Sequence, residues 1–178
     1  MRFFALTLAV FALFLTSARA ETFPVIDNPT VLKECGECHM AFPPQTLTRA
    51  VWTQMINGLS DHFGEDASLD PKVAAEVLNY HLANASDVSD TRAAMKWTSD
   101  TPFIRLTEGP RFKEKHGGCS QSVWDDPKVK SKANCLACHA TMQKDGSTEA
   151  DIRFLPNDAQ SQCNGLGAFG AFMDRMFQ

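Results

Sequence analysis

The sequence predicts a mainly α-helical fold in which long loops are tied to a bound group, and three observations support this prediction. The 178 residues have an ordinary globular composition, with 44% apolar residues, 10 Gly and 9 Pro, so a disordered, collagen-like or coiled-coil chain is excluded. Residues 47–63 and 71–85 carry apolar residues at helical spacing. Four of the six cysteines recur in two copies of one short motif, which indicates a covalently held group.

The first twenty residues have the pattern of a secretory signal peptide. Arg2 gives a positive start, residues 3–15 are apolar, and Ala18-Arg19-Ala20 forms a small-x-small cleavage site. An uncleaved anchor would need about 20 apolar residues to span a bilayer. We expect cleavage after Ala20, a periplasmic location, and a mature chain of 158 residues with net charge −6 and no integral membrane segment. The acidic balance argues against nucleic acid as a partner.

Two helices are predicted after this leader. The first covers residues 47–63, between a Pro-Pro pair and a glycine that are typical start and stop signals. The second begins after Asp70, a good N-cap, has Pro71 at its first position, and runs to about Ala85. The apolar face of the first helix consists of Trp52, Met55, Ile56, Leu59 and Phe63.

The repeated cysteine motif is the attachment signature of c-type haem. Cys35-Gly36-Glu37-Cys38-His39 and Cys135-Leu136-Ala137-Cys138-His139 both read C-x-x-C-H. Two thiols on one helical turn can each form a thioether with a haem vinyl group, and the following histidine becomes the proximal iron ligand. The sequence therefore predicts two covalently attached haem c groups.

Zinc binding and thiol exchange are the alternatives for these cysteines. A zinc site built from two C-x-x-C pairs usually separates them by about 15–20 residues, whereas 96 residues lie between Cys38 and Cys135. A thioredoxin-like motif needs a βαβ context, which this sequence does not indicate. A histidine at the same place in both motifs favours haem over either alternative.

The remaining cysteines, Cys119 and Cys163, are candidates for a disulfide because exported proteins meet an oxidising compartment. Such a bond would span 44 positions and hold the C-terminal segment across the second haem motif. Two separate thiols, or a bond to another chain, are the alternatives.

The distal iron ligands decide between an electron carrier and an enzyme, because a six-coordinate haem moves electrons whereas an open position binds a substrate. With His39 and His139 as proximal ligands, His62, His81 and His116 remain. His62 lies at the edge of the first helix's apolar face, His81 has the features of a hydrogen-bonded histidine between helices, and His116 lies in a polar segment that by itself indicates a solvated side chain.

Spacing favours two of these three histidines. His39 and His62 are 23 positions apart, and so are His116 and His139; closing loops of this length costs less entropy than a longer crossed pairing. We therefore assign His39 and His62 to haem 1 and His139 and His116 to haem 2, while a crossed pairing and a role for His81 stay open.

Methionine is the rival distal ligand. Met40 adjoins His39 and cannot reach the opposite haem face, and Met55 belongs to the apolar stripe of the first helix. Methionines at helical spacing more often pack than ligate, and no motif surrounds Met95, Met142, Met173 or Met176.

The chain resembles the dihaem cytochromes c of bacterial periplasms, which are described as partners of a small oxygen-binding monohaem cytochrome c, the sphaeroides haem protein. The resemblance covers about residues 34–156, and several matching blocks in order are more specific than C-x-x-C-H alone. The blocks are Cys35-x-x-Cys38-His39, Phe42-Pro43-Pro44, Trp52, His62-Phe63-Gly64-Glu65-Asp66-Ala67-Ser68-Leu69, Arg105-Leu106-Thr107, Pro110, Phe112, His116, Trp124, Val129, Ser131, Asn134-Cys135, Cys138-His139, Ile152-Arg153 and Pro156.

This resemblance implies two small domains after the signal peptide. Residues 21–90 would form a class I cytochrome c-like domain around haem 1, and residues 91–178 a loop-rich C-terminal domain around haem 2. It also implies bis-histidine ligation of both irons and has no counterpart for His81. The implied ligands are His39, His62, His116 and His139.

The chain departs from the family pattern near the second haem. Arg111 stands where an aromatic residue is expected, Gly117-Gly118 and Cys119 look additional, and the tail of residues 157–178 has no counterpart. These differences concern the exposure of haem 2 and the surface offered to a partner.

The leading function hypothesis is a periplasmic electron carrier without enzymatic activity. Bis-histidine ligation lacks the methionine that raises potential in other cytochromes c, so low potentials are expected, and an acidic protein should be steered to a basic redox partner. Partners would include a small oxygen-binding monohaem cytochrome c and a membrane cytochrome donor. The alternative is a haem enzyme, a peroxidase or small reductase, with one open or labile iron; a sensor or assembly subunit ranks last.

Overall fold

The computed structural model describes residues 21–101 and 103–163, so the expected signal peptide lies outside the described residues. The prediction of a mainly α fold is confirmed: the described residues contain no β-strand and only two isolated β-bridges. No helix among them is both long and apolar enough to cross a bilayer. The α-helices are α2 (Pro29–Glu34), α3 (Arg49–Asn57), α4 (Pro71–Asn84), α5 (Arg92–Trp97), α6 (Pro110–His116), α7 (Gln121–Trp124), α8 (Met142–Asp145) and α9 (Asn157–Cys163).

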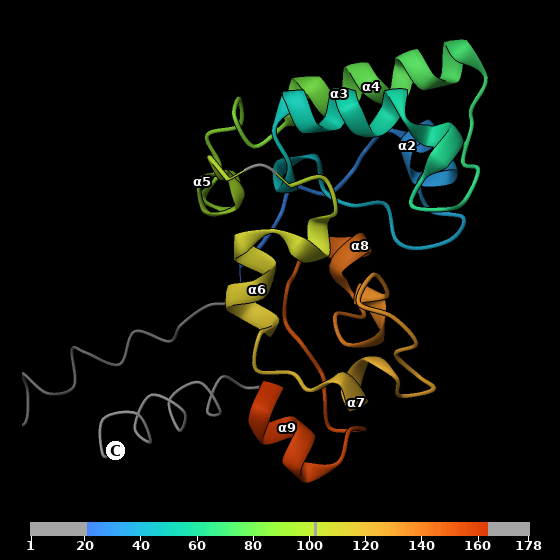
Figure 1. Cartoon of the computed structure of the whole chain (residues 1–178). Helices are drawn as coiled ribbons and strands as arrows, with labels where there is room; N and C mark the ends of the chain where they lie inside the picture. Colours follow the sequence, from blue (N-terminus) through green and yellow to red (C-terminus); the bar gives the residue numbers. More distant parts are fainter. Residues whose placement is uncertain (1–20, 102, 164–178) are drawn as a thin grey trace, which may run out of the picture.

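The longest helices, α3 and α4, lie side by side at one end of the molecule, with α2 and α5 nearby (Figure 1). Trp52 of α3 contacts the ring of His81 on α4, with 4.1 Å between ring centroids, and its Nε1 donates a hydrogen bond to the backbone oxygen of Pro44 at 2.8 Å. The main buried cluster consists of Phe23, Ile26, Val31, Ala41, Leu47, Trp52, Ile56, Val77, Ala85, Ala93, Trp97, Leu106 and Phe112.

The boundaries of α4 agree with the sequence prediction. The Asp70 carboxylate accepts a hydrogen bond from the Lys72 amide, Pro71 occupies the first helical position, and the helix ends before Ala85. The side-chain cap satisfies one of the amides that a helix start leaves without a partner. Local signals of this kind require no tertiary information, which is why they could be recognised in the sequence.

The prediction of one helix over 47–63 was wrong at both ends. Helix α3 begins after Thr48, whose hydroxyl accepts from the amide of Val51, and stops at Gly58. A short 3-10 turn, Leu59–Asp61, follows, and His62 lies beyond it. Glycine is a poor residue inside a helix and a common one at its end, so Gly58 ends the helix although apolar residues continue at helical spacing.

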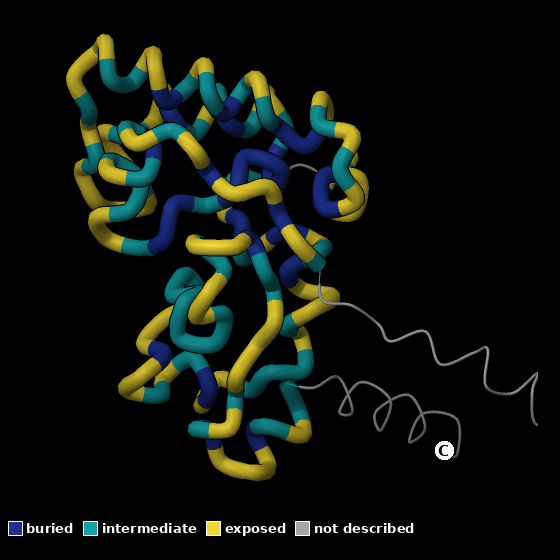
Figure 2. The backbone as a smooth tube through the Cα atoms, turned by 180° about the vertical axis from the view of Figure 1, so that it is seen from behind, coloured by how far each residue is buried: buried dark blue, intermediate teal, exposed yellow. Residues whose placement is uncertain are grey.

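Residues 117–163 contain only short helices joined by turns. Their own buried cluster is small, consisting of Val123, Val129, Leu155 and Ala159. Figure 2 shows the same difference along the backbone, because most buried positions lie in the half with α3 and α4 or where the two halves meet. The domain division at residue 90 stays a prediction; α6 contributes Phe112 to the larger cluster.

The beginning of the described chain, residues 21–23, is hydrogen-bonded to residues 146–148 and so connects the part that contains α3 and α4 with the part that contains α7 to α9. The amide of Phe23 donates to the Gly146 oxygen at 2.9 Å, and the amide of Thr148 donates to the Glu21 oxygen at 3.0 Å. Gly146 has a φ of +73°, and a Cβ atom there would collide with the backbone oxygen of Phe23. Glycine alone meets both requirements.

Candidate haem sites

The four motif cysteines form no disulfide, whereas the remaining two are joined to each other. Burial raises the pKa of the Cys35 and Cys135 thiols to about 11, so neither is an activated thiolate of the kind that thiol exchange requires. No group of three or more His, Cys, Asp or Glu side chains in 21–101 and 103–163 could hold a metal ion. The raised thiol pKa values disfavour thiol exchange.

The first candidate site pairs His39 with His62. The centroids of the two imidazole rings lie 6.2 Å apart. His39 Nδ1 lies 2.7 Å from the Met40 backbone oxygen, and its ring stacks on Phe42 with 4.7 Å between centroids. A hydrogen bond from Nδ1–H to that carbonyl would leave Nε2 free as a metal ligand and fix the ring orientation.

His62 is held by a tight turn. Its amide donates to the Glu65 oxygen at 2.7 Å, and the next two residues, Phe63 and Gly64, have φ values of +57° and +99°. The guanidinium carbon of Arg105 lies 3.9 Å from the centroid of the Phe63 ring. The buried Nδ1 of His62 has no hydrogen-bond partner within the part of the chain that the structure describes. Burial lowers the pKa of His62, which favours the neutral, ligating form.

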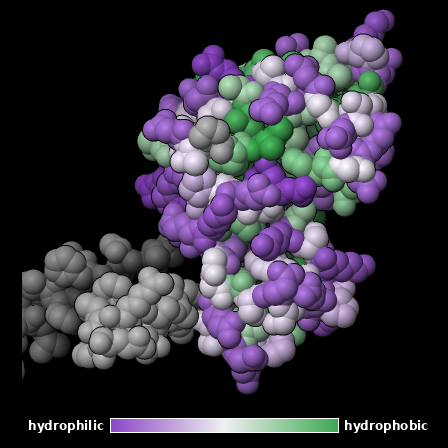
Figure 3. Space-filling view, viewed as in Figure 1, coloured by the Kyte–Doolittle hydropathy of each residue, from purple (hydrophilic) through white to green (hydrophobic). Residues whose placement is uncertain are grey.

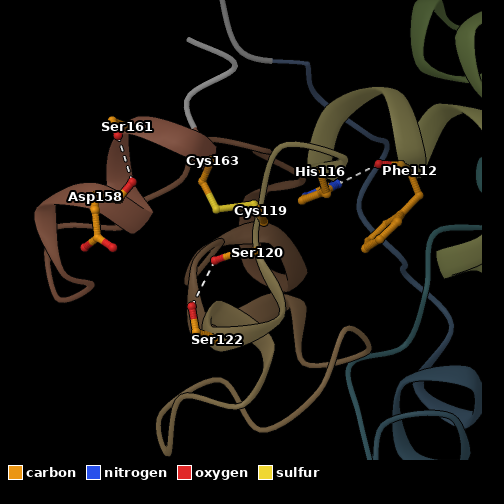
Figure 4. Close-up of a disulfide and its surroundings, with 8 residues drawn as sticks. All are labelled: Phe112, His116, Cys119, Ser120, Ser122, Asp158, Ser161 and Cys163. Carbon is orange, nitrogen blue, oxygen red and sulfur yellow. Dashed lines mark hydrogen bonds between the residues drawn. A yellow bond between two sulfur atoms is a disulfide. The ribbon is translucent and has the colours of Figure 1, made fainter. Parts of the chain in front are cut away.

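The second candidate site pairs His116 with His139, with ring centroids 6.0 Å apart. His116 is the last residue of α6; its Nδ1 lies 3.1 Å from the Phe112 oxygen, and its ring stacks on that of Phe112 with 4.3 Å between centroids (Figure 4). His139 Nδ1 lies 3.3 Å from the Glu149 oxygen. Burial lowers the pKa of His116. With a backbone carbonyl near each Nδ1, both histidines of this pair are arranged to offer Nε2.

Cys119 and Cys163 form a disulfide that joins α9 to the segment directly after His116 (Figure 4). Their Cα atoms are 4.4 Å apart. The amide of Cys119 also donates to the His116 oxygen at 3.0 Å. A Cβ atom on Gly118 would collide with the backbone oxygen of Gln162, so α9 packs directly against the chain that carries the predicted distal ligand.

Both ring pairs have the separation that a shared iron requires. With each imidazole nitrogen about 2 Å from the metal, the two ring centroids would lie about 6 Å apart. The observed separations of 6.2 Å and 6.0 Å match this spacing. The residues therefore fit two haem irons, whose chemistry when bound is one-electron exchange between ferric and ferrous states.

A cavity of about 360 Å³ lies beside the second pair. Its wall includes Cys135, Cys138, His116 and His139, and also Phe42 and Trp97 from the first half of the chain. Such mostly apolar walls suit a porphyrin. Residues well before the second motif would thus help to enclose a haem bound in this cavity.

Arg111 also lines this cavity. Its side chain is 11% exposed, and its terminal nitrogens bond Glu114 at 2.8 Å and Glu21 at 3.4 Å. Its Nε is buried without a partner in residues 21–101 and 103–163. A guanidinium nitrogen of this kind would suit a carboxylate such as a haem propionate.

His81 and the described methionines belong to neither of the two ring pairs. His81 is 1% exposed, with its Nδ1 2.8 Å from the Val77 oxygen, and is packed on Trp52. Met40 is buried and Met95 is 66% exposed. Met142 lines the cavity, but it follows His139 by three residues. Met173 and Met176 lie outside the described residues.

Sequence reasoning missed the groups that orient the histidines. The Phe112–His116 stack could have been found, since residues four apart share a helix face. The oxygens of Met40 and Glu149 and the contact of Arg105 with Phe63 carry no local signal, because they depend on tertiary placement.

Two covalent attachment motifs, each with a second imidazole at iron-bridging distance, define a c-type cytochrome with two haem sites. Residues 31–146 match the dihaem cytochrome c family, and the chain belongs to that family. Its members bind two covalent haem c groups and serve in haem-based electron transfer.

Solved structures of the same kind are similar to this chain. A diheme cytochrome c from Rhodobacter sphaeroides is 37% identical with a TM-score of 0.59, and the alignment covers 67% of this chain and 96% of that chain. A diheme cytochrome type c from Shewanella baltica OS155 is 31% identical with a TM-score of 0.54, covering 67% and 86%. No curated protein matches the sequence.

Proposed function

We propose that this protein is a non-enzymatic electron carrier with two low-spin, bis-histidine haems. His39 and His62 ligate haem 1, and His116 and His139 ligate haem 2. The observation that carries this proposal is the 6.2 Å and 6.0 Å separation of the two ring pairs, which suits an iron between each pair. Since neither iron would keep an open position, electron exchange is the function that this geometry supports best.

The ligand set also supports low reduction potentials. Thioether ligation by methionine raises the potential of a haem, whereas two imidazoles do not. Hydrogen bonds from Nδ1 to backbone carbonyls make imidazole more basic, and three of the four histidines have such a carbonyl within 3.3 Å. A redox titration in which both haems had strongly positive potentials would contradict the assignment.

The first test is an absorption spectrum of the dithionite-reduced holoprotein before and after carbon monoxide is added. We expect unchanged low-spin bands, because both irons are saturated. Ala variants of His62 and His116 should each open one iron and bind carbon monoxide at half the haem. A wild-type protein that binds carbon monoxide at half its haem would refute bis-histidine ligation of both irons.

A second candidate function, a haem enzyme or ligand-binding protein with one labile iron, is favoured by the surroundings of His62. This residue lacks a partner for Nδ1 and borders a cavity of about 150 Å³ that Met55 and Ile104 also line. Partial carbon monoxide binding by the wild type that His62→Ala leaves unchanged, and that His116→Ala extends to the second haem, would support this function and place the open iron at haem 1.

The location and partners are part of the same proposal. The signal pattern of residues 1–20 supports export to the periplasm with cleavage after Ala20, and mass spectrometry of the secreted protein tests it. A small oxygen-binding monohaem cytochrome c and a membrane cytochrome donor are the proposed partners. Retention of residues 1–20 in the haem-loaded protein would contradict the expected cleavage.

A further inference from the structure

Charge is distributed unevenly between the two haem sites. Residues 21–91 carry eleven Asp and Glu against three Lys and Arg, whereas residues 92–163 carry nine against eleven. Glu37, Asp61 and Glu65 are exposed beside the motif and distal ligand of haem 1. The electrostatic field that steers a partner is local, so the net charge of the chain does not describe the surroundings of haem 2.

Three lysines line the cavity that would hold haem 2: Lys96, Lys115 and Lys132. The Lys96 ammonium lies 3.3 Å from Glu21, and that of Lys115 lies 3.7 Å from Glu114. Lys132 is exposed and has no carboxylate within 4 Å in the described part of the chain. At least one cation at this cavity is therefore uncompensated.

Lys132 lies over the ring of Trp124, which is next to the predicted iron ligand His116. Its Nζ is 5.9 Å from the centroid of Trp124, which is 6.2 Å from the centroid of the His116 ring and 6.1 Å from that of Phe112. Trp124 is half-buried and also lines the cavity. A protein bound at Lys132 and Trp124 would thus be one aromatic ring away from the distal ligand of haem 2.

More lysines surround this position without ion pairs. Lys113, Lys128 and Lys130 are exposed, and none has a carboxylate within 4 Å among residues 21–101 and 103–163. In the view of Figure 3, the half of the molecule that contains α6 to α9 is mostly hydrophilic at its surface. Cations around a partly exposed aromatic ring are suited to an acidic protein partner.

We propose that Lys115, Trp124 and Lys132 form a docking surface at haem 2 for an acidic redox protein. This inference rests on the proposed electron-transfer function and replaces the expectation of a single basic partner. The acidic surroundings of haem 1 remain for a basic one, so electrons enter and leave at surfaces of opposite charge.

Neutralisation of the haem propionates is the competing role for these cations. Arg111 already offers a buried nitrogen to a propionate, whereas Lys132 is exposed and lies above Trp124. A cation that serves only a propionate would change the potential of haem 2 without changing how its reaction with a protein depends on salt.

The test measures electron transfer from flavodoxin hydroquinone, an acidic flavoprotein, to the ferric holoprotein by stopped-flow absorption. One electron leaves the flavin, which becomes the semiquinone, and reduces one ferric haem. Because the chain is acidic overall, net charge alone predicts that added salt speeds this reaction. The proposed surface predicts the opposite: the second-order rate constant should fall about tenfold between low and physiological salt.

The variant Lys115→Glu/Lys132→Glu should lose this decrease and react more slowly at low salt. The matched control Lys33→Glu/Lys72→Glu makes the same change in net charge on the acidic half and should keep the wild-type salt dependence. Faster reaction with added salt in the wild type, or equal effects of the two double variants, would overturn the proposal. The proposal would also be overturned if Lys115→Glu/Lys132→Glu shifted the haem potential but kept the wild-type salt dependence.

Carbon monoxide spectra of the same samples keep the two proposals separate. Low-spin spectra without carbon monoxide binding, together with the wrong salt dependence, would overturn the docking surface and leave the electron-carrier function standing. Carbon monoxide binding by the wild type would refute the bis-histidine function itself.

Discussion

Protonation of His81 should make the protein less stable in mild acid. Its side chain is 1% exposed and packed on Trp52, and burial lowers its pKa from 6.5 to about 4. Between these two values the unfolded chain binds a proton that the folded chain does not, so stability rises with pH and is lost as pH falls. At 1.36 kcal/mol per pKa unit, the loss is about 2 kcal/mol between pH 7.5 and pH 5 and about 3 kcal/mol when complete.

The assay is guanidinium unfolding of the holoprotein, followed by far-ultraviolet circular dichroism at several pH values. Groups other than His81 also contribute to the pH dependence of unfolding, so the comparison is with His81→Leu, which fills a similar volume and cannot be protonated. The free energy of unfolding of the variant should depend less on pH by about 2 kcal/mol over the same interval. Equal pH dependence in both proteins would refute the reasoning, because burial would then not lower the pKa of His81.

Three further changes test the packing around the haem sites, each by guanidinium unfolding. Cys119→Ser/Cys163→Ser removes the disulfide that closes a loop of 44 positions and should cost about 4 kcal/mol by the chain-entropy relation. Unchanged stability would mean that the disulfide does not stabilise the packing of α9 beside α6. Trp52→Phe removes the 2.8 Å hydrogen bond to the Pro44 oxygen, which keeps only the longer bond of 3.4 Å from the Leu47 amide, and should cost about 1 kcal/mol; no loss would mean that water replaces the indole. Gly146→Ala should cost more than Gly64→Ala: both positions have positive φ, but only at Gly146 would the added carbon meet another backbone segment. Equal losses of stability would show that the close contact with the Phe23 backbone adds nothing to the cost.

The parts of the fold that could be predicted from the sequence are those with short-range causes. The haem motifs are contiguous, and α4 carries its own cap at Asp70. The end of α3 was missed because apolar periodicity continues past Gly58, where the backbone leaves the helix. The cavity for haem 2 could not be predicted, since Phe42 and Trp97 reach it from distant parts of the chain.

The surroundings of the two candidate distal histidines differ from what their local sequence indicates. Polar neighbours by themselves indicated a solvated His116, yet α6 aligns its Nδ1 with the Phe112 oxygen and stacks the two rings. The Cys119–Cys163 disulfide then fixes the chain three residues later. His62, which the sequence placed on a regular helix, lies instead in a turn with two positive φ values and a buried Nδ1 without a partner in the described residues. Because a hydrogen bond at Nδ1 orients the ring and strengthens it as a ligand, any loss of six-coordination should occur first at haem 1, away from the lysine surface at haem 2.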